Sequence, residues 1–107
     1  MAEKSITKYM PLSEATYYIL LSLVEPLHGY GVMQKVETTS AGTVSIGPGT
    51  LYGAFTTLEK EGLISMVREE QRRKSYALTL RGRDVLKEQI SRLQIMVRNG
   101  QDILSQL

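Results

Sequence analysis

The sequence predicts a mainly α-helical fold with one small β-hairpin, and three stretches of the 107-residue chain indicate it. Residues 46–63 contain a helix start signal, one apolar stripe and a helix stop signal. Residues 64–78 change to the period of two that is typical of strands. Residues 79–107 repeat large aliphatic side chains at alternating spacings of four and three, as a long helix with an apolar seam does.

Composition limits the possible functions. The chain has no cysteine, which excludes disulfides, thiolate metal sites and a cysteine nucleophile. Its formal net charge of +2 neither proves nor excludes binding to nucleic acid. Residues 1–12 lack the apolar run of a signal peptide, and no segment reaches the roughly 18 uncharged apolar residues that span a bilayer. We therefore expect a soluble, cytoplasmic protein without a membrane partner.

The central helix is expected to begin at Pro48 and to stop at Gly62. Proline suits the first helical position because its missing N–H would have no partner there, and glycine suits the left-handed residue that ends a helix. At about 100° per residue, Leu51, Phe55 and Leu58 fall on one side, together with Ala54. This side is expected to be buried.

The opposite face of the central helix has no carboxylate near its centre. It offers hydroxyls that can donate to phosphates or base edges, glycines that let a partner approach, and one lysine. An ordinary amphipathic surface helix would also expose threonine and lysine, so this stretch alone leaves both interpretations open. The candidate DNA-contacting residues of this face are Gly49, Tyr52, Gly53, Thr56 and Lys60.

Two helices are expected before the central one. The first opens at the N-cap Ser13, is apolar nearly all round, and is stopped by Pro26, so it belongs to a core or a subunit interface. A second, shorter helix follows, with Gly42 as its stop and with Tyr30, Met33 and Val36 at helical spacing. In the polar arm before both, Lys4 and Lys8 are expected to be disordered, with contact to a phosphate as the alternative.

His28 is the only histidine of the chain. A lone histidine in a turn is more often structural than catalytic. No triad, metal cluster or pair of carboxylates with catalytic spacing accompanies it in the sequence. We therefore expect no enzyme, no cofactor and no metal site.

The hairpin is expected to consist of strands at 64–68 and 74–78 joined by a charged tip. The negative charges of Glu69 and Glu70 lie close in sequence to the cations of this tip and partly cancel them. The twist of a hairpin could still place the negative and positive side chains on different sides. A run of cations usually marks only a solvated turn, although here it follows a helix with a hydroxyl-rich face. The tip cations, as candidate phosphate contacts, are Arg72, Arg73 and Lys74.

Three helices followed by a two-stranded hairpin make a winged helix-turn-helix. The residues also resemble the PadR family of bacterial transcriptional regulators. The resemblance lies in YILLSLVEPLHGYGV at 18–32, GPGTLYGAFTTLEKEGLI at 47–64, RRKSYALTLRG at 72–82, and a long helix after them. Each piece alone is weak, but the combination is specific and covers most of the chain.

The resemblance implies a homodimeric repressor that binds an inverted-repeat operator and is often released by a small ligand. Carried over by motif, Thr50, Tyr52 and Thr56 lie in the reading helix, and residues 72–74 lie in the wing. Gly53 stands where relatives commonly have a larger side chain, which puts a base contact there in doubt. Gln71 stands at the wing tip where relatives often have glycine or proline.

The last helix is expected to begin after the N-cap Thr79, which divides the chain into a winged helix at 1–78 and a dimerisation helix at 79–107 within one compact unit. So small a domain has no room to bury a seam of this length, so we expect packing against a second copy. Folding back onto its own domain is the alternative. The expected dimer interface consists of Leu86, Ile90, Leu93, Val97 and Leu104.

A ligand site is a further hypothesis. If Tyr17 and Tyr18 meet Leu93 and Val97 across the dimer, the meeting place is apolar with a few hydroxyls and could hold a small aromatic effector. The chain has no tryptophan to act as a stacking platform, so a closed core without a ligand is the alternative.

Two function classes fit the sequence. The first is a dimeric repressor that binds double-stranded DNA. The second is a winged-helix module for protein–protein interaction, which would use the same face without DNA binding and would not need a cationic wing. Salt-dependent binding to duplex DNA distinguishes the two classes.

Overall fold

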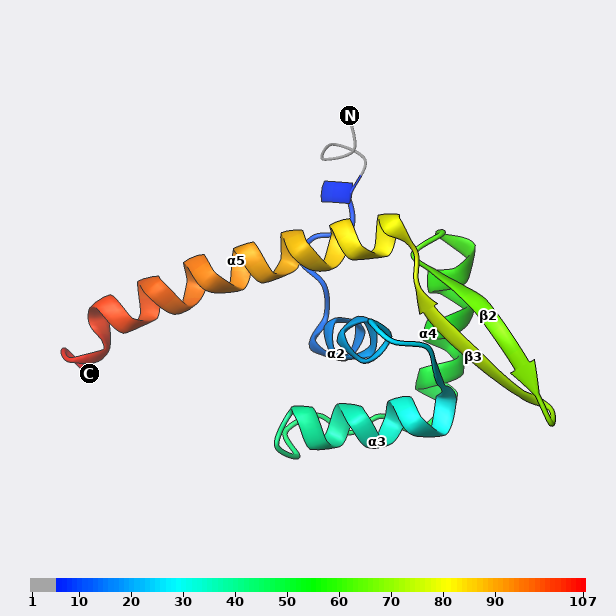
Figure 1. Cartoon of the computed structure of the whole chain (residues 1–107). Coiled ribbons are helices and arrows are strands. Elements are labelled where there is room, and N and C mark those ends of the chain that lie inside the picture. The colour runs from blue at the N-terminus through cyan, green and yellow to red at the C-terminus, as the bar shows by residue number, and fades with distance from the viewer. Residues whose placement is uncertain (1–5) are drawn as a thin grey trace.

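A computed structural model describes residues 6–107 and confirms the winged helix-turn-helix with its long C-terminal helix. Helices α2 to α4 gather around a common core, the hairpin projects to one side, and α5 runs over the top and away to the other side (Figure 1). The elements are, in order, α2 Glu14–Ser22, β1 Leu27–His28, α3 Gly29–Thr39, α4 Pro48–Lys60, β2 Ile64–Glu70, β3 Arg73–Leu78 and α5 Leu80–Leu104.

Both ends of α4 follow the local signals in its sequence. Pro48 is its first residue, and Gly62 adopts the left-handed conformation with φ 77°. The amide of Gly62 donates to the Glu59 carbonyl at 3.0 Å, and that of Leu63 donates to the Leu58 carbonyl at 2.9 Å. This pair of bonds satisfies two carbonyls that the helix end would otherwise leave free.

Helix α2 lies at the centre of the domain (Figure 1). Ser13 caps it as expected, since its hydroxyl oxygen accepts from the Thr16 amide at 3.1 Å. Ile19 and Leu20 are fully buried, whereas Val24 beyond the helix end is 40% exposed. The helix ends at Ser22, earlier than Pro26, and its burial makes it the support for the elements around it.

Helix α3 turns a different side inward than the sequence suggested. Val32 and Val36 are fully buried, whereas Tyr30 is 59% exposed, so its expected place beside Met33 on one stripe was wrong. A strict spacing of three drifts by about 60° per step around a helix, and Tyr30 therefore faces away from Val36. The helix also ends at Thr39, before Gly42, which follows with φ 78°.

The sheet has three strands in the order β1-β3-β2, so the expected hairpin gains a short third strand. Leu27 of β1 pairs with Tyr76, and His28 pairs with Ser75. Both hairpin strands extend further toward the tip than expected, and Gln71 and Arg72 form the turn with φ 51° and 67°. Paired left-handed residues of this kind form the turns that suit the twist of hairpins.

The segment before α2 packs onto the domain, contrary to the expectation of disorder for Lys8 and its neighbours; Lys4 lies outside the described residues. Ile6 is 5% exposed and belongs to the core. The Leu12 amide donates to the Gln89 Oε1 of α5 at 3.0 Å. The segment therefore fastens α5 to the rest of the domain.

The end of α4, the hairpin and the start of α5 meet at one tightly packed junction. The Thr79 hydroxyl donates to the Gly62 carbonyl at 2.6 Å and accepts from the Gly82 amide at 3.0 Å. The Thr79 amide donates to the Leu63 carbonyl at 3.0 Å. Gly82 lies so close that an added Cβ would overlap the Leu63 carbonyl oxygen. Within residues 6–107, no helix is long and apolar enough to cross a membrane.

The junction yields a prediction about stability. Gly82→Ala should lower the free energy of unfolding by about 3 kcal/mol, because the backbone carbonyl of Leu63 cannot move aside as a side chain could. Urea denaturation followed by circular dichroism measures the change. The matched control is Gly53→Ala in α4, where an added Cβ meets nothing within 4 Å and helix propensity should raise stability by about 0.5–1 kcal/mol. Equal stabilities of Gly82→Ala and the wild type would contradict this packing.

Candidate nucleic-acid interface

The exposed face of α4 has the orientation that the sequence predicts. Leu51, Phe55 and Leu58 are buried at 0%, 3% and 6% exposure. All six candidate residues of the helix are exposed, namely Gly49, Thr50, Tyr52, Gly53, Thr56 and Lys60. The exposed Thr57 was missed, although at about 100° per residue it lies only about 40° from Gly53. Thr50 lies at the edge of this face, about 60° from Gly53.

The hydroxyls and glycines of α4 define what this face can contact. The Thr56 hydroxyl donates to the Tyr52 carbonyl at 3.0 Å, so its oxygen remains as an acceptor and its methyl group is free for apolar contact. An added Cβ at Gly49 or Gly53 would meet nothing within 4 Å. Packing within the chain therefore does not require glycine at these two positions.

Tyr52 leans sideways from α4, toward α3 and the hairpin. Its ring meets the Phe55 ring edge-on, with the centroids 6.0 Å apart, and it stays 52% exposed. An added Cβ on Gly29, the first residue of α3, would lie 2.8 Å from Cζ of Tyr52. The ring therefore rests across the start of α3.

A concavity of about 470 Å³ opens between Tyr52, the start of α3 and the hairpin tip, and we call it the wing groove. No carboxylate lines it, and α3 starts there without a side-chain cap or an acidic first turn, so the positive end of the helix faces it uncompensated. No local pattern in the sequence indicated a binding role for His28, Tyr30 and Tyr76, which the fold brings to the groove. The lining residues are His28, Gly29, Tyr30, Tyr52, Gln71, Arg72, Arg73, Lys74 and Tyr76.

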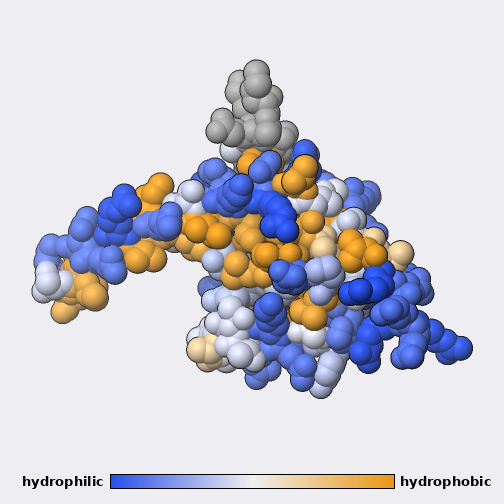
Figure 2. All heavy atoms as spheres, viewed as in Figure 1, coloured by the Kyte–Doolittle hydropathy of each residue, from blue (hydrophilic) through white to orange (hydrophobic). Residues whose placement is uncertain are grey.

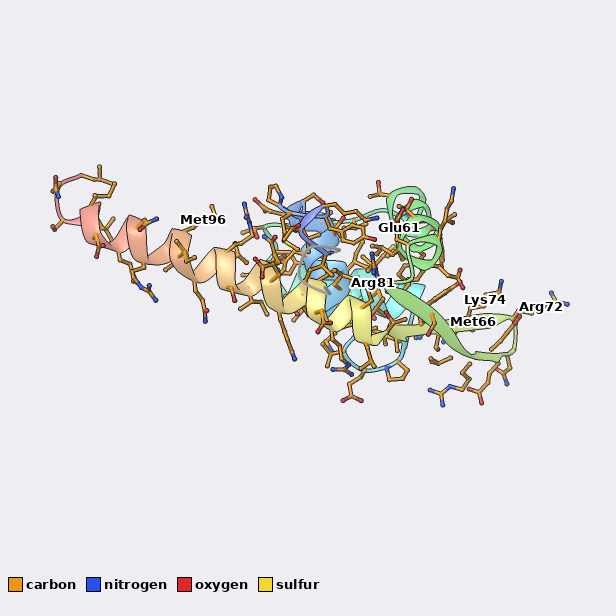
Figure 3. The ribbon with its side chains drawn as sticks, turned by 90° about the horizontal axis from the view of Figure 1, so that it is seen from above. Glu61, Met66, Arg72, Lys74, Arg81 and Met96 are labelled. Carbon is orange, nitrogen blue, oxygen red and sulfur yellow. The ribbon has the colours of Figure 1, made fainter. Side chains whose placement is uncertain are left out.

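The charges of the hairpin do not separate to different sides, contrary to expectation. The strand register places Glu69 opposite Lys74 and Glu70 opposite Arg73, because paired residues share one face of a sheet. Arg72 occupies the turn itself and has no cross-strand partner. It extends from the tip into solvent (Figure 3), which makes it the cation least neutralised by its own hairpin.

The expected dimer seam divides into two parts along α5. Leu86 is only 6% exposed and belongs to the core of its own chain, so it is not available to a second copy, while Ile90 and Leu93 are half-buried. Val97 and Leu104 are 56% and 64% exposed on the part of α5 that projects beyond the domain (Figure 1). Apolar groups appear among polar ones along this projecting part (Figure 2).

Two exposed apolar residues that lie beside the predicted seam of α5 were missed in the sequence analysis. Met96 and Ile103 are 63% and 50% exposed. At about 100° per residue they lie within about 20° of each other and about 60–80° from Leu93, on the same side of the helix. They widen the apolar stripe beyond the heptad positions on which the sequence analysis relied.

The expected effector residues meet within one chain, so their contact does not need a dimer. A concavity of about 360 Å³ is lined by Tyr17, Tyr18 and Leu93 together with residues of the N-terminal segment. A neighbouring concavity of about 520 Å³ is lined by Tyr17, Leu93 and Val97. The Tyr17 and Tyr18 rings are 5.3 Å apart, and burial, with a smaller contribution from Tyr18, raises the pKa of Tyr17 above 10.0. The hydroxyl is therefore a neutral donor near neutral pH.

Known proteins are similar to this chain in sequence and in fold. Residues 18–88 match the sequence model of the transcriptional regulator PadR-like family. An uncharacterized 37.1 kDa protein in transposon TN4556 of Streptomyces fradiae is 35% identical over 81 residues, which cover 75% of this chain and 23% of that protein. The transcriptional regulator YqjI of Escherichia coli is 29% identical over 69 residues, 64% of this chain and 33% of that protein. The chain thus spans a third or less of these curated relatives.

A solved structure has the same fold over almost its whole length. A PadR family transcription regulator from Clostridium difficile superposes with a TM-score of 0.73 at 20% identity. The match covers 86% of this chain and 99% of that one.

Proposed function

Because the chain belongs to the transcriptional regulator PadR-like family, we propose that it is a homodimeric repressor that binds an inverted-repeat operator in double-stranded DNA. The observation that carries this proposal is the exposed face of α4, which presents hydroxyls, glycines and Lys60 beside a groove lined by cations and free of carboxylates. A helix of this kind fits the major groove of B-DNA while the wing meets the backbone.

The outward residues of α4 suit the edges of bases. Thr56 can accept a hydrogen bond from an exocyclic amino group and can place its methyl group against thymine. Thr57 and Lys60 extend the same face. The open space at Gly49 and Gly53 supports the role of these glycines in close approach to DNA, since the fold itself does not require them.

The projecting half of α5 supports the dimer. Its exposed apolar side chains have no covering element within residues 6–107 (Figure 1). Contact with a second copy around a two-fold axis would bury them and would present two α4 helices to two symmetric half-sites. The interface proposed from the structure begins at Ile90 and Leu93 and continues through Val97 and Leu104, with Met96 and Ile103 beside them.

The dimer can be tested on an exposed seam residue. Val97→Glu should convert the dimer into a folded monomer, because two like charges would be placed in an apolar contact near the symmetry axis. Ile95→Glu is the matched control, since Ile95 is 55% exposed but lies about 160° around the helix from Val97. Sedimentation equilibrium of both variants measures the mass. A dimer that survives Val97→Glu but dissociates in Ile95→Glu would place the interface on the other side of α5.

Loss of a phosphate contact and loss of a base contact should have different effects on DNA affinity. Arg72→Ala should weaken binding to operator and random duplexes by a similar factor and flatten the salt dependence by about 0.9 units of slope, because a phosphate contact releases one counterion. Thr56→Ala should weaken only operator binding, by about 1 kcal/mol or more. The operator sequence is identified by selection from random DNA with the purified protein. Fluorescence anisotropy at several salt concentrations then measures the dissociation constants for the operator and for a random duplex. Lys87→Ala, an equal loss of charge on α5, is the control.

Absence of salt-dependent duplex binding by the wild type would instead favour the protein-interaction module. A selected consensus without two-fold symmetry would contradict the inverted-repeat operator. These two results are independent of each other, so the DNA partner and the symmetry of the site are tested separately.

We also propose that a small aromatic effector binds where Tyr17 and Tyr18 meet Leu93 and Val97. The neighbouring concavities at this place combine apolar side chains with hydroxyl donors, as small-molecule sites do. Leu93 belongs both to this surface and to the proposed seam, which would link an effector to the dimer. Planar aromatic compounds should raise the Tm of the wild type and not of Tyr17→Ala. If none of the compounds changes the Tm of the wild type or of Tyr17→Ala, a closed core without a ligand is favoured.

A further inference from the structure

We infer that Tyr52 contacts the DNA backbone rather than a base edge, and that its hydroxyl and the wing cations hold one phosphate group of the bound duplex in the wing groove. This inference rests on the proposed DNA-binding function and assigns a backbone contact to Tyr52, which the family resemblance places in the reading helix. Four observations support it: the direction of the side chain, the residue beneath it, the state of its hydroxyl and the charge of its surroundings.

The direction of Tyr52 takes it away from the outward side of α4. At about 100° per residue it lies about 100° from Gly53 and only about 60° from the buried Phe55. Its ring meets Phe55 edge-on, and Phe55 in turn packs on Tyr76 of β3 with the ring centroids 4.7 Å apart. The Tyr52 ring is therefore held by the base of the wing and not by the neighbours that point to the major groove.

The absence of a side chain at Gly29 leaves the space that the Tyr52 ring occupies. An added Cβ at Gly29 would overlap the hydroxyl end of this ring, and its Cζ would lie only 2.8 Å away. The positive-φ glycines of the described chain are Gly42 and Gly62, so the backbone conformation of Gly29 does not require glycine. What requires glycine at this position is the close contact with Tyr52.

The hydroxyl of Tyr52 is available for a ligand. It has no hydrogen-bond partner among residues 6–107, and the side chain is 52% exposed. It lines the same groove as Arg73 and Lys74, and no carboxylate is among the lining residues. Glu69 and Glu70, which pair with these cations in the strand register, do not reach the groove. A phenol hydroxyl can donate a hydrogen bond, and cations beside it attract an anionic phosphate oxygen more than the uncharged edge of a base pair.

Hydrogen bonds to phosphate position a protein on DNA and carry no sequence information directly. Tyr52→Phe removes only the hydroxyl, so it should weaken binding to operator and random duplexes by the same factor, roughly 5- to 20-fold. The salt dependence should stay unchanged, because a neutral side chain releases no counterion. Lys74→Ala should also weaken both duplexes but should flatten the slope by about 0.9 units. Ser91→Ala on α5, which removes an exposed hydroxyl outside the groove, should leave both constants unchanged.

Gly29→Ala tests the same contact without touching Tyr52. The added methyl group should displace the ring and reproduce the uniform loss of Tyr52→Phe, and the double variant should lose little more than either single variant. Urea denaturation of each variant identifies any loss that comes from unfolding. Duplexes with single neutral methylphosphonates then locate the phosphate: at one position in each half-site, the substitution should weaken the wild type by a larger factor than Tyr52→Phe, which keeps only the contacts of the wing cations.

The outcomes separate this inference from the proposed function. If Tyr52→Phe weakened operator binding alone, Tyr52 would read a base and the inference would be overturned while DNA binding stood. Unchanged constants for Tyr52→Phe would also overturn it, since Tyr52 would then serve packing only. A wild type that binds no duplex in a salt-dependent manner would overturn the proposed function and this inference together.

Discussion

The burial of Leu51, Phe55 and Leu58 fixes the rotation of α4 about its own axis, and the rest of the molecule depends on that rotation. Each of these side chains gains about 1.5–3 kcal/mol from burial. Turning the helix by one residue position, about 100°, would expose most of this surface, whereas a single base contact contributes only about 1–3 kcal/mol. The core therefore decides which face α4 presents, and the proposed contacts to DNA would have to be built on that face.

The junction around Thr79 connects α4, the hairpin and α5. Thr79 bonds to the carbonyls of Gly62 and Leu63 after the end of α4, and Gly82 packs against this point from the first turn of α5. On the other side, the Tyr9 hydroxyl donates to Glu61 at 2.8 Å and accepts from Arg81 at 3.2 Å, which brings Glu61 and Arg81 together (Figure 3). Helix α5 is thus joined to the end of α4 by short polar contacts and not by a flexible linker, so a displacement of α5 in the proposed dimer would reach α4.

Helix α5 has two roles that its sequence does not separate. Its first turns complete the core of the domain, with Val85 and Leu86 buried, and its second half projects with an uncovered apolar stripe. Since both halves belong to one helix, the geometry of a dimer formed by the second half would fix the distance between two α4 helices. The spacing of operator half-sites would then be a property of α5.

The sequence by itself determined the parts that depend on neighbours along the chain. Proline at 48 and glycine at 62 delimited α4, the hydroxyls at 13 and 79 marked two N-caps, and the period of two located the hairpin, because caps, turns and strand alternation are local chemistry. Only the tertiary structure decided the rest. The pairing of β1 with β3, the alignment of Glu69 with Lys74, the burial of Leu86 and the sideways placement of Tyr52 over Gly29 all join residues through packing or strand register. Such contacts are set by how whole elements are oriented in space, which no local pattern specifies.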